Sequence, residues 1–449
     1  MISMIVLLLT AIVAMFWPRR LPNFAFVAVM VLGLAAAIWA LILPNPLAQF
    51  PMLEFSRFTM IFGGLFIGLT AIVILMLSRG VRLLNGHISE YAVLVLFSAI
   101  GALVLISCTH MVTFFLGIEI LSIPLYVLAA SNTRSSASHE AGLKYFILGS
   151  VASAIMLFGL ALLFAQTGQL YLSELLGQLS MGIPNSITLV ALCLFLFGLF
   201  FKIGLVPFHF WVPDVYQGTP LVFTGFMATV AKGAALVMLF RIFGTGNTPV
   251  ILSYAIWNFA ALSMIVGNLI ALKQSSFKRI LAYSSVAHSG YIAMLLLAGT
   301  SAAAFILFFY ILAYSLSVLT LFYIYDLKTS TTTDTLEPLQ GLARQHPILG
   351  IAFVFAVLSL SGIPPLAGFF AKYVLFVPLM ATGNTALLLV AVVSSVIGAV
   401  YYLRLLPLLF QSASEGPTVS KPAHALVVLL TVLSVLIGIF PGFLALLFH

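Results

Sequence analysis

The sequence predicts an all-α polytopic membrane protein with about 14 transmembrane helices and two inverted five-helix repeats, each containing a broken helix. Of the 449 residues, 63% are hydrophobic and only 6% are charged, whereas soluble domains carry roughly 25% charged residues. Apolar segments of about 20 residues, the length that crosses a bilayer, follow one another along the chain, and glycine and proline interrupt two of them. The longest polar stretch, residues 326–344, is too short to form a soluble domain.

The first apolar segment begins close to the amino terminus. It carries no basic residue ahead of its apolar run, as a signal peptide requires, so we expect a first membrane span here. The spans are expected near residues 2–17, 22–43, 57–78, 91–108, 110–130, 141–165, 187–205 with 207–218, 219–242, 250–272, 279–298, 302–325, 347–361 with 366–382, 384–409 and 423–447.

We divide these spans into four regions. Residues 1–78 hold helices one to three, and residues 423–447 form helix fourteen. Residues 91–242 form the first repeat, helices four to eight, and residues 250–409 form the second, inverted repeat, helices nine to thirteen.

The basic residues predict how the chain is threaded through the membrane. Of the 18 lysines and arginines, twelve fall in odd-numbered loops, two (Arg57 and Arg241) in even-numbered loops and four within spans. Cytoplasmic loops carry an excess of lysine and arginine, so we expect odd-numbered loops in the cytoplasm and both termini on the other side. A miscounted helix would scramble this alternation, which supports the number of spans.

Two spans are interrupted at corresponding positions. The motif Gly-Leu-Val-Pro at 204–207 interrupts the seventh span, and Gly-Ile-Pro-Pro at 362–365 interrupts the twelfth. Because the two lie five spans apart, they have opposite orientations in the membrane. Interrupted helices in two inverted halves indicate a transport site near the bilayer midplane, where irregular backbone is tolerated only if it is buried or lines a cavity.

Six ionisable residues lie inside the predicted spans: Glu119, Lys144, Lys202, Lys232, His288 and Lys372. A lysine near the bilayer centre costs roughly 2.5–3.5 kcal/mol on insertion, so deep lysines indicate function. Desolvation disfavours the charged form of a lysine and a nearby carboxylate favours it, so movement of Glu119 relative to Lys202 would change proton affinity. We interpret the six residues as a proton relay, linked by hydroxyl groups and internal water.

Each member also has a structural interpretation. Lys144 lies near the end of a span, from which a lysine can extend its amine to the membrane surface. Glu119 can form a static pair between helices, and His288 can be an ordinary hydrogen-bonded core residue. The other three lysines are too deep to reach the membrane surface easily.

The sequence contains no motif for a disulfide, a metal site, a nucleotide or a haem. Cys108 and Cys193 lie in apolar runs without a partner or ligand spacing, so neither a disulfide nor a metal site is expected. Glycine-rich nucleotide motifs and haem ligation patterns are also missing from the sequence, so electron transfer and NADH binding would have to occur in other proteins.

Several motifs resemble those of subunit N of proton-translocating NADH-quinone oxidoreductase (respiratory complex I), one of its antiporter-like membrane subunits. The resemblance covers nearly the whole chain. The broken-helix motifs also resemble those of multi-subunit cation/proton antiporters, whereas KYFILGS and AYSSVAHSGY look more like subunit N. The motifs are FFLGIEILSIPLYVL at 114–128, EAGLKYFILGSVASAIMLFGLALLF at 140–164, FKIGLVPFHFWVPDVYQGTP at 201–220, FKRILAYSSVAHSGY at 277–291 and SLSGIPPLAGFFAKYVLF at 359–376.

The resemblance implies a proton channel in which Glu119 and Lys202 form the paired site of the first repeat, with Lys144 beside it. It implies that Lys232 is the central relay and that Lys372 faces the external exit. In one departure, Ala231 precedes Lys232 where the family often has proline, which puts the local helix break in doubt.

The resemblance also implies where the missing chemistry resides. No cofactor is expected in this chain; NAD, FMN, iron–sulfur clusters and quinone are expected in partner subunits. The expected partners are other membrane and peripheral subunits of complex I, especially neighbouring antiporter-like subunits, and the lipid bilayer, with no nucleic acid. The expected location is a bacterial-type inner (cell) membrane.

Two other functions stay open at this point. A subunit of a multi-subunit cation/proton antiporter would use the same fold to exchange Na⁺ or K⁺ for protons, and a sodium requirement of transport would favour it. A structural membrane subunit would hold its lysines as static groups, and pumping would then survive their neutralisation.

Overall fold

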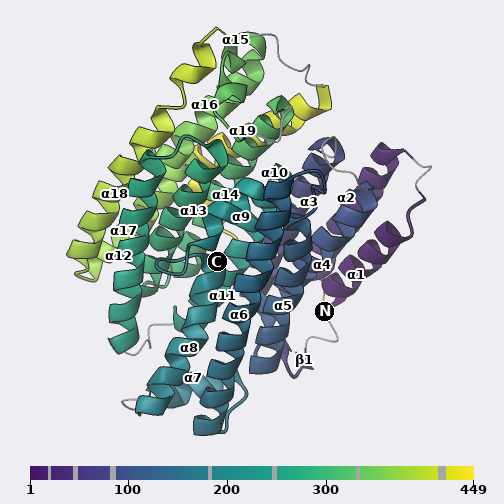
Figure 1. The fold of residues 1–449 in the computed structure, drawn as a ribbon. Coiled ribbons are helices and arrows are strands. Elements are labelled where there is room, and N and C mark those ends of the chain that lie inside the picture. Colours follow the sequence, from purple (N-terminus) through teal and green to yellow (C-terminus); the bar gives the residue numbers. More distant parts are fainter. Residues whose placement is uncertain are drawn as a thin grey trace. The chain divides into compact units, whose positions relative to one another are not determined.

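The computed structural model describes residues 1–18, 22–43, 49–80, 87–180, 185–244, 250–329, 334–412 and 421–448. Most of these residues are helical (Figure 1). The two strands among the described residues, β1 (Gln49–Phe50) and β2 (Leu53–Glu54), pair in one short antiparallel hairpin. Helices suit this sequence because a backbone in lipid must satisfy its polar groups internally. The predicted all-α membrane class is confirmed. Arg19, Arg20 and Arg82, three of the basic loop residues, lie outside the described residues.

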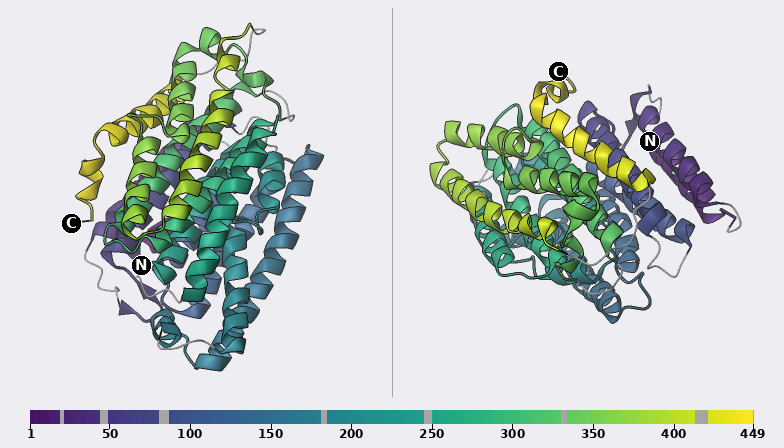
Figure 2. Two further views of the ribbon diagram at one scale, coloured as in Figure 1. Left: turned by 90° about the vertical axis from the view of Figure 1, so that its left-hand side faces the viewer. Right: turned by 90° about the horizontal axis from the view of Figure 1, so that it is seen from above.

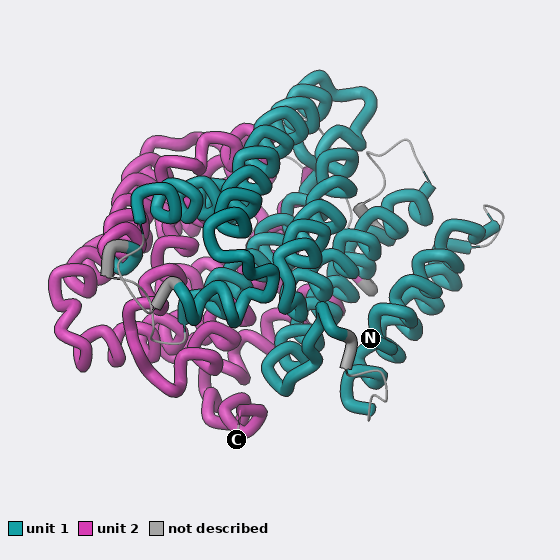
Figure 3. The backbone as a smooth tube through the Cα atoms, turned by 90° about the horizontal axis from the view of Figure 1, so that it is seen from below, with its two compact units in different colours: residues 1–204, 218–253 teal, residues 205–217, 254–449 magenta. Residues whose placement is uncertain are grey.

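The chain divides into two compact units (Figure 3). Unit 1 comprises residues 1–204 and 218–253, and unit 2 comprises residues 205–217 and 254–449. The helices of unit 1 are α1 (Ile2–Met15), α2 (Asn23–Ile42), α3 (Arg57–Gly80), α4 (Ile88–Ser107), α5 (Met111–Ala129), α6 (Ser136–Thr167), α7 (Leu172–Ser180), α8 (Ser186–Ile203), α10 (Leu221–Phe226), the π-helix η2 (Met227–Ala231) and α11 (Lys232–Phe243).

Unit 2 includes α9, which lies between α8 and α10 in the sequence. Its helices are α9 (Trp211–Gly218), α12 (Val250–Leu272), α13 (Phe277–Ala293), η3 (Met294–Leu297), α14 (Ala303–Lys328), η4 (Glu337–Leu339), α15 (Leu342–Gln345), α16 (Pro347–Ser361), α17 (Ala367–Ala381), α18 (Thr385–Leu403), η5 (Pro407–Phe410), α19 (Lys421–Ile439) and α20 (Pro441–Ala445). Gly218, the last residue of α9, and residues 250–253, at the start of α12, belong to unit 1.

Eleven helices among the described residues are long and apolar enough to cross a membrane. The shorter apolar helices are α1, α17 and the described part of α19. Helix α16 passes the same test only together with the preceding segment Glu337–Gln345, relative to which it is bent by 119°. A helix is found in each of the predicted spans, but the prediction of about 14 crossings stays a prediction because several of these helices are short.

In unit 1, the short link between α4 and α5 is fixed by an arginine from α11. Arg241 Nη1 donates to the carbonyl oxygens of Ile106 (2.8 Å) and Cys108 (2.7 Å). Its Nη2 atom pairs with the Glu54 carboxylate at 2.5 Å. Carbonyls at a helix C-terminus have no partner within the helix, so this guanidinium replaces the missing donors. Helices α4 and α5 pack closely along their lengths, as do the purple helices α1 and α2 (Figure 2).

The helices differ in how much of their surface is covered. In an apolar 18-residue window of each of the stretches 221–243 and 277–297, 94% of the residues are buried, and in such a window of Ala303–Lys328 the share is 89%. In the corresponding window of α6 only 39% of the residues are buried, and apolar side chains such as Leu143 and Phe146 are exposed on this helix. Apolar residues on an outer helix are compatible with lipid, whereas ionisable residues on a covered helix must find protein partners.

Candidate functional site

The first broken helix ends at Gly204, two residues after Lys202. Gly204 adopts the left-handed conformation (φ 75°) and donates its amide to the Phe200 carbonyl at 2.8 Å, which ends α8. A residue without a Cβ favours this conformation, so glycine is the usual end of a helix. Lys202 is 9% exposed. Its side chain therefore lies in the last turn of a helix that stops inside the protein.

Hydroxyl groups from α5 hold Lys202. Its Nζ donates to Ser122 Oγ at 2.9 Å and to the Tyr126 hydroxyl at 2.8 Å. Ser122 and Tyr126 follow Glu119 by three and seven residues on α5, so all three lie on one helical face. This spacing was the signal in the sequence that could have identified the two hydroxyl residues.

Glu119 belongs to the same cluster in unit 1. Its Oε1 atom accepts a hydrogen bond of 2.5 Å from Ser153 Oγ of α6, and its charge acts on Lys202. None of the ion pairs found among the described residues joins the two side chains directly. Glu119 and Lys202, the predicted pair, therefore do not form a direct ion pair. Serine and tyrosine hydroxyls contact each of them instead.

Lys144 lies elsewhere on α6. Its Nζ pairs with Glu140 Oε1 at 2.7 Å, one turn earlier, and the two side chains are 41% and 64% exposed. Lys144 is therefore half-exposed on α6, as the alternative in which its amine extends to the membrane surface requires.

Lys232 follows an irregular turn. It is the first residue of α11 and comes directly after the π-helix η2. Single π-turns within helices are frequent at functional sites. The side chain is 4% exposed, so the sequence prediction of a deeply buried lysine holds here. The turn ends at Ala231, so the backbone irregularity is present without proline.

At the second helix break, Lys372 follows the break in sequence and belongs to α17. Its amine nevertheless contacts the C-terminal end of α16. Gly362 (φ 83°) ends α16, and a Cβ at this glycine would lie 3.2 Å from Lys372 Nζ. The amine donates to the carbonyls of Leu360 (3.1 Å) and Ser361 (3.2 Å) and to Ser395 Oγ (2.9 Å). The C-terminus of a helix carries partial negative charge, so α16 stabilises the ammonium form of this buried lysine.

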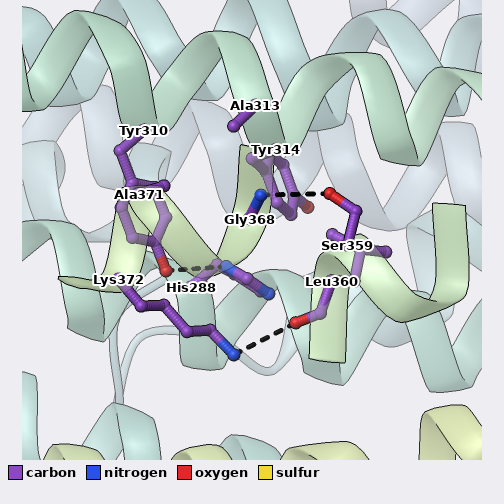
Figure 4. Close-up of a pocket in the computed structure, with 9 residues that line it drawn as sticks. All are labelled: His288, Tyr310, Ala313, Tyr314, Ser359, Leu360, Gly368, Ala371 and Lys372. Carbon is purple, nitrogen blue, oxygen red and sulfur yellow. Dashed lines mark hydrogen bonds between the residues drawn. The ribbon is translucent and has the colours of Figure 1, made fainter. Parts of the chain in front are cut away.

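His288 on α13 lies between two tyrosines of unit 2. Its Nδ1 is 2.9 Å from the Tyr310 hydroxyl, and its Nε2 is 3.4 Å from the Tyr402 hydroxyl, which in turn bonds with Ser284. Figure 4 shows His288 and Lys372 lining one small cavity, together with residues of α14 and α16. The structure therefore brings two of the predicted residues to one place in unit 2, as it does Glu119 and Lys202 in unit 1.

The hydroxyl partners of His288 and Lys372 were not predicted from the sequence. Tyr310, Tyr402 and Ser395 are far from the ionisable residues along the chain and meet them only through tertiary packing. No group of three or more His, Cys, Asp or Glu side chains suited to a metal occurs in the part of the chain that the structure describes.

The chain is similar to known membrane subunits over most of its length. The family model described as NADH:quinone oxidoreductase/Mrp antiporter, TM matches residues 108–398. NADH-quinone oxidoreductase subunit N of Geobacter metallireducens is 38% identical, with 98% of this chain and 94% of that protein covered. NADH-quinone oxidoreductase subunit 14 of Thermus thermophilus is 42% identical, with 79% and 78% covered. Subunit N of Cytophaga hutchinsonii is 36% identical, with 89% and 88% covered.

Solved structures show the same fold. A chain of respiratory complex I from Thermus thermophilus with bound Aureothin aligns with a TM-score of 0.84 and 36% identity, covering 98% of this chain and 97% of that one. A chain of the Mrp complex from Dietzia sp. aligns with a TM-score of 0.81 at 21% identity, covering 99% and 94%, which shows the fold alone. On these matches the chain belongs to the NADH:quinone oxidoreductase/Mrp antiporter membrane family, and within it to NADH-quinone oxidoreductase subunit N.

Proposed function

We propose that this chain translocates protons across the membrane as a subunit of NADH:quinone oxidoreductase, driven by quinone reduction in partner subunits. One observation supports this most strongly: Lys202 and Lys372 are buried, and each amine lies at a glycine-ended helix break among oxygen atoms. A buried amine can exist with or without its proton, because burial disfavours the charge and neighbouring oxygens favour it. Such a group can accept a proton and release it again.

In unit 1, we assign the first step to Glu119 and Lys202. The Ser153, Ser122 and Tyr126 hydroxyls contact one or the other of these groups. Hydroxyl groups both donate and accept hydrogen bonds, so they are suited to pass a proton between an acid and a base. Lys144 takes a secondary place because it is half-exposed and paired with Glu140.

We assign the central relay to Lys232 and the later steps to His288 and Lys372. Lys232 is buried next to a π-turn, and an imidazole titrates closer to neutral pH than any other unperturbed side chain. Lys372 releases the proton toward the non-cytoplasmic side. The inverted repeats at 91–242 and 250–409 would give the two halves access from opposite sides of the membrane.

The proposal places the redox chemistry in other subunits. NAD, FMN, iron–sulfur clusters and quinone bind there, and this chain supplies the proton path. Its partners are neighbouring antiporter-like membrane subunits and peripheral subunits of the complex. The chain lies in a bacterial-type cell membrane with both termini on the non-cytoplasmic side, as the basic loops indicate.

Replacement of Lys202 tests this function. In membrane vesicles that contain the whole complex, Lys202→Ala should abolish most proton uptake per NADH oxidised, while the complex still assembles. Lys273→Ala is a matched control, because Lys273 is an exposed residue at the end of α12. Normal proton uptake coupled to quinone reduction in Lys202→Ala would refute the relay.

A cation/proton antiporter subunit is the second candidate. The family model includes Mrp antiporters, and the fold of the Mrp complex chain matches. The relatives above, at 36 to 42% identity, favour the oxidoreductase instead. A purified complex that lacks flavin and iron–sulfur subunits and needs Na⁺ or K⁺ for transport would establish the antiporter.

A further inference from the structure

An arginine at the end of α18 binds the C-terminal end of α12 in unit 2. Arg404 directly follows α18. Its Nη1 atom donates to the Leu272 carbonyl at 2.6 Å, and its Nη2 atom donates to the Gln274 carbonyl. Leu272 is the last residue of α12, and carbonyls at a helix end have no partner within the helix. The guanidinium therefore supplies the missing donors, and it ties the first helix of the second predicted repeat to the last.

The same arrangement occurs in unit 1. There, Arg241 of α11 donates to the carbonyls of Ile106 and Cys108 at the end of α4, and α4 and α11 are the first and last helices of the first predicted repeat. In both units the two bound carbonyls are two residues apart in sequence, and one forked guanidinium can bind both. Arg241 is one of the two basic residues that fall in even-numbered loops, and these bonds give it a reason to be there.

A second pair of contacts aligns the two repeats in the same way. A Cβ added to Gly101 of α4 would lie 2.2 Å from the Leu121 amide nitrogen of α5, and one added to Gly267 of α12 would lie 2.7 Å from the Ala287 amide nitrogen of α13. The two glycines are 166 residues apart in sequence, and the carbonyls that the two arginines bind are separated by the same number. This agreement supports the equivalence of the two arginines.

Each arginine lies nine residues after a residue of the proposed relay or one of its partners. Lys232 precedes Arg241 on α11, and Ser395, which accepts from Lys372 Nζ at 2.9 Å, precedes Arg404 on α18. Nine residues of α-helix make about two and a half turns and about 13 Å, so the two side chains project from opposite sides of their helix. The arginine therefore acts through the helix, whose axial position its hydrogen bonds fix.

We propose that Arg241 and Arg404 are equivalent positioning residues, one in each repeat, which set the axial position of the last helix against the first and so hold Lys232 and Ser395 in the relay. A shift of α18 by one residue would move Ser395 by about 1.5 Å, which would lengthen and misalign its hydrogen bond to Lys372. The Lys372 amine would then keep only two of its three oxygen partners. The inference rests on the proposed function, since it concerns the geometry of the same relay.

A double-mutant cycle in the intact complex, reconstituted into vesicles, tests this role. The measurement is the proton uptake per NADH oxidised, and the scale is the part of this uptake that Lys372→Ala removes. Arg404→Gln removes the fork and should lower this part about tenfold, the order of factor that loss of one hydrogen bond to a charged group corresponds to. Ser395→Ala should lower it to a similar extent. The double variant should lose no more than the weaker-pumping single variant, because Arg404 acts through Ser395.

Three further variants accompany the cycle. Arg134→Gln is the matched control, because Arg134 is exposed between α5 and α6, and its uptake should be normal. Arg404→Lys keeps the positive charge but not the fork, so it should restore part of the uptake. Arg241→Gln should lower uptake as Arg404→Gln does. The complex should assemble in the Arg404 variants, since a hydrogen bond of 3.1 Å from Tyr401 to Asn268 also joins α18 to α12.

Normal uptake in an assembled complex with Arg404→Gln or Arg241→Gln would overturn the inference. Losses that multiply in the double variant would also overturn it, because they would indicate a general packing effect. If Arg404→Gln does not assemble, the cycle is run with Arg404→Lys, and the same two outcomes decide. Lys372→Ala separates the two claims. If it stops uptake while Arg404→Gln does not, the positioning role is wrong and the relay stands. If Lys372→Ala pumps normally, the relay itself is wrong.

Discussion

The Lys202 amine lies 2.8 Å from the Tyr126 hydroxyl. Tyr126 and Glu119 come from the same face of α5, and the carboxylate of Glu119 bonds to Ser153 rather than to the lysine. Hydroxyl groups therefore contact both the Glu119 carboxylate and the Lys202 amine. A proton that leaves either group encounters a side chain that can both accept and donate.

Tyr126→Phe is predicted to slow proton translocation about tenfold, because a hydrogen bond to a charged group contributes roughly 1.5–3 kcal/mol and Lys202 would lose one. The complex should assemble, since the aromatic ring and its packing against Tyr145 remain. The measurement is the rate of proton uptake into vesicles at a fixed rate of NADH oxidation. Tyr254→Phe, at an exposed tyrosine, should be neutral. Unchanged uptake in Tyr126→Phe would show that this hydroxyl has no part in the relay.

Gly362→Ala should impair translocation more than its effect on stability explains. A residue with a Cβ in the left-handed conformation costs roughly 1–2 kcal/mol, and here the added Cβ would also lie 3.2 Å from Lys372 Nζ. Gly383→Ala is a matched control, because Gly383 has a φ of 74° and no atom within 4 Å of the added Cβ. Thermal unfolding of the two variants should be similar, and only Gly362→Ala should lose proton uptake. Equal uptake would contradict the assigned position of Lys372.

Lys144→Ala is predicted to reduce uptake much less than Lys202→Ala. Its ion pair with Glu140 is largely exposed, and exposed pairs contribute about 0–1 kcal/mol to stability. Uptake rates and the yield of assembled complex are compared for Lys144→Ala, Glu140→Ala and Lys202→Ala. A loss as complete in Lys144→Ala as in Lys202→Ala would place Lys144 in the main path.

The parts of this protein that follow from local chemistry can be predicted from its sequence. The breaks at Gly204 and Gly362 were visible because glycine and proline interrupt apolar runs, and the deep lysines were visible because charge is costly in such runs. The helical class followed from composition. The spacing along α5 also indicates Ser122 and Tyr126, the two hydroxyl partners of Lys202, although they were not predicted.

The remaining features depend on tertiary structure. Ser395 contacts Lys372, and Tyr402 contacts His288, across large separations in sequence that no periodicity encodes. The exposure of Lys144 depends on which face of α6 is covered. The π-turn before Lys232 was missed because the sequence at 227–231 has ordinary helix-forming residues and no proline.

The central claim is that the buried lysines gain and lose protons. Lys202→Arg tests it most directly, because arginine keeps the positive charge but does not release its proton in proteins. The measurement is the number of protons taken up per NADH oxidised, in vesicles that contain the fully assembled complex. The relay predicts that this ratio falls as far in Lys202→Arg as in Lys202→Ala, while complex assembly is normal. A normal ratio in Lys202→Arg would show that a fixed charge is sufficient, and would contradict the relay.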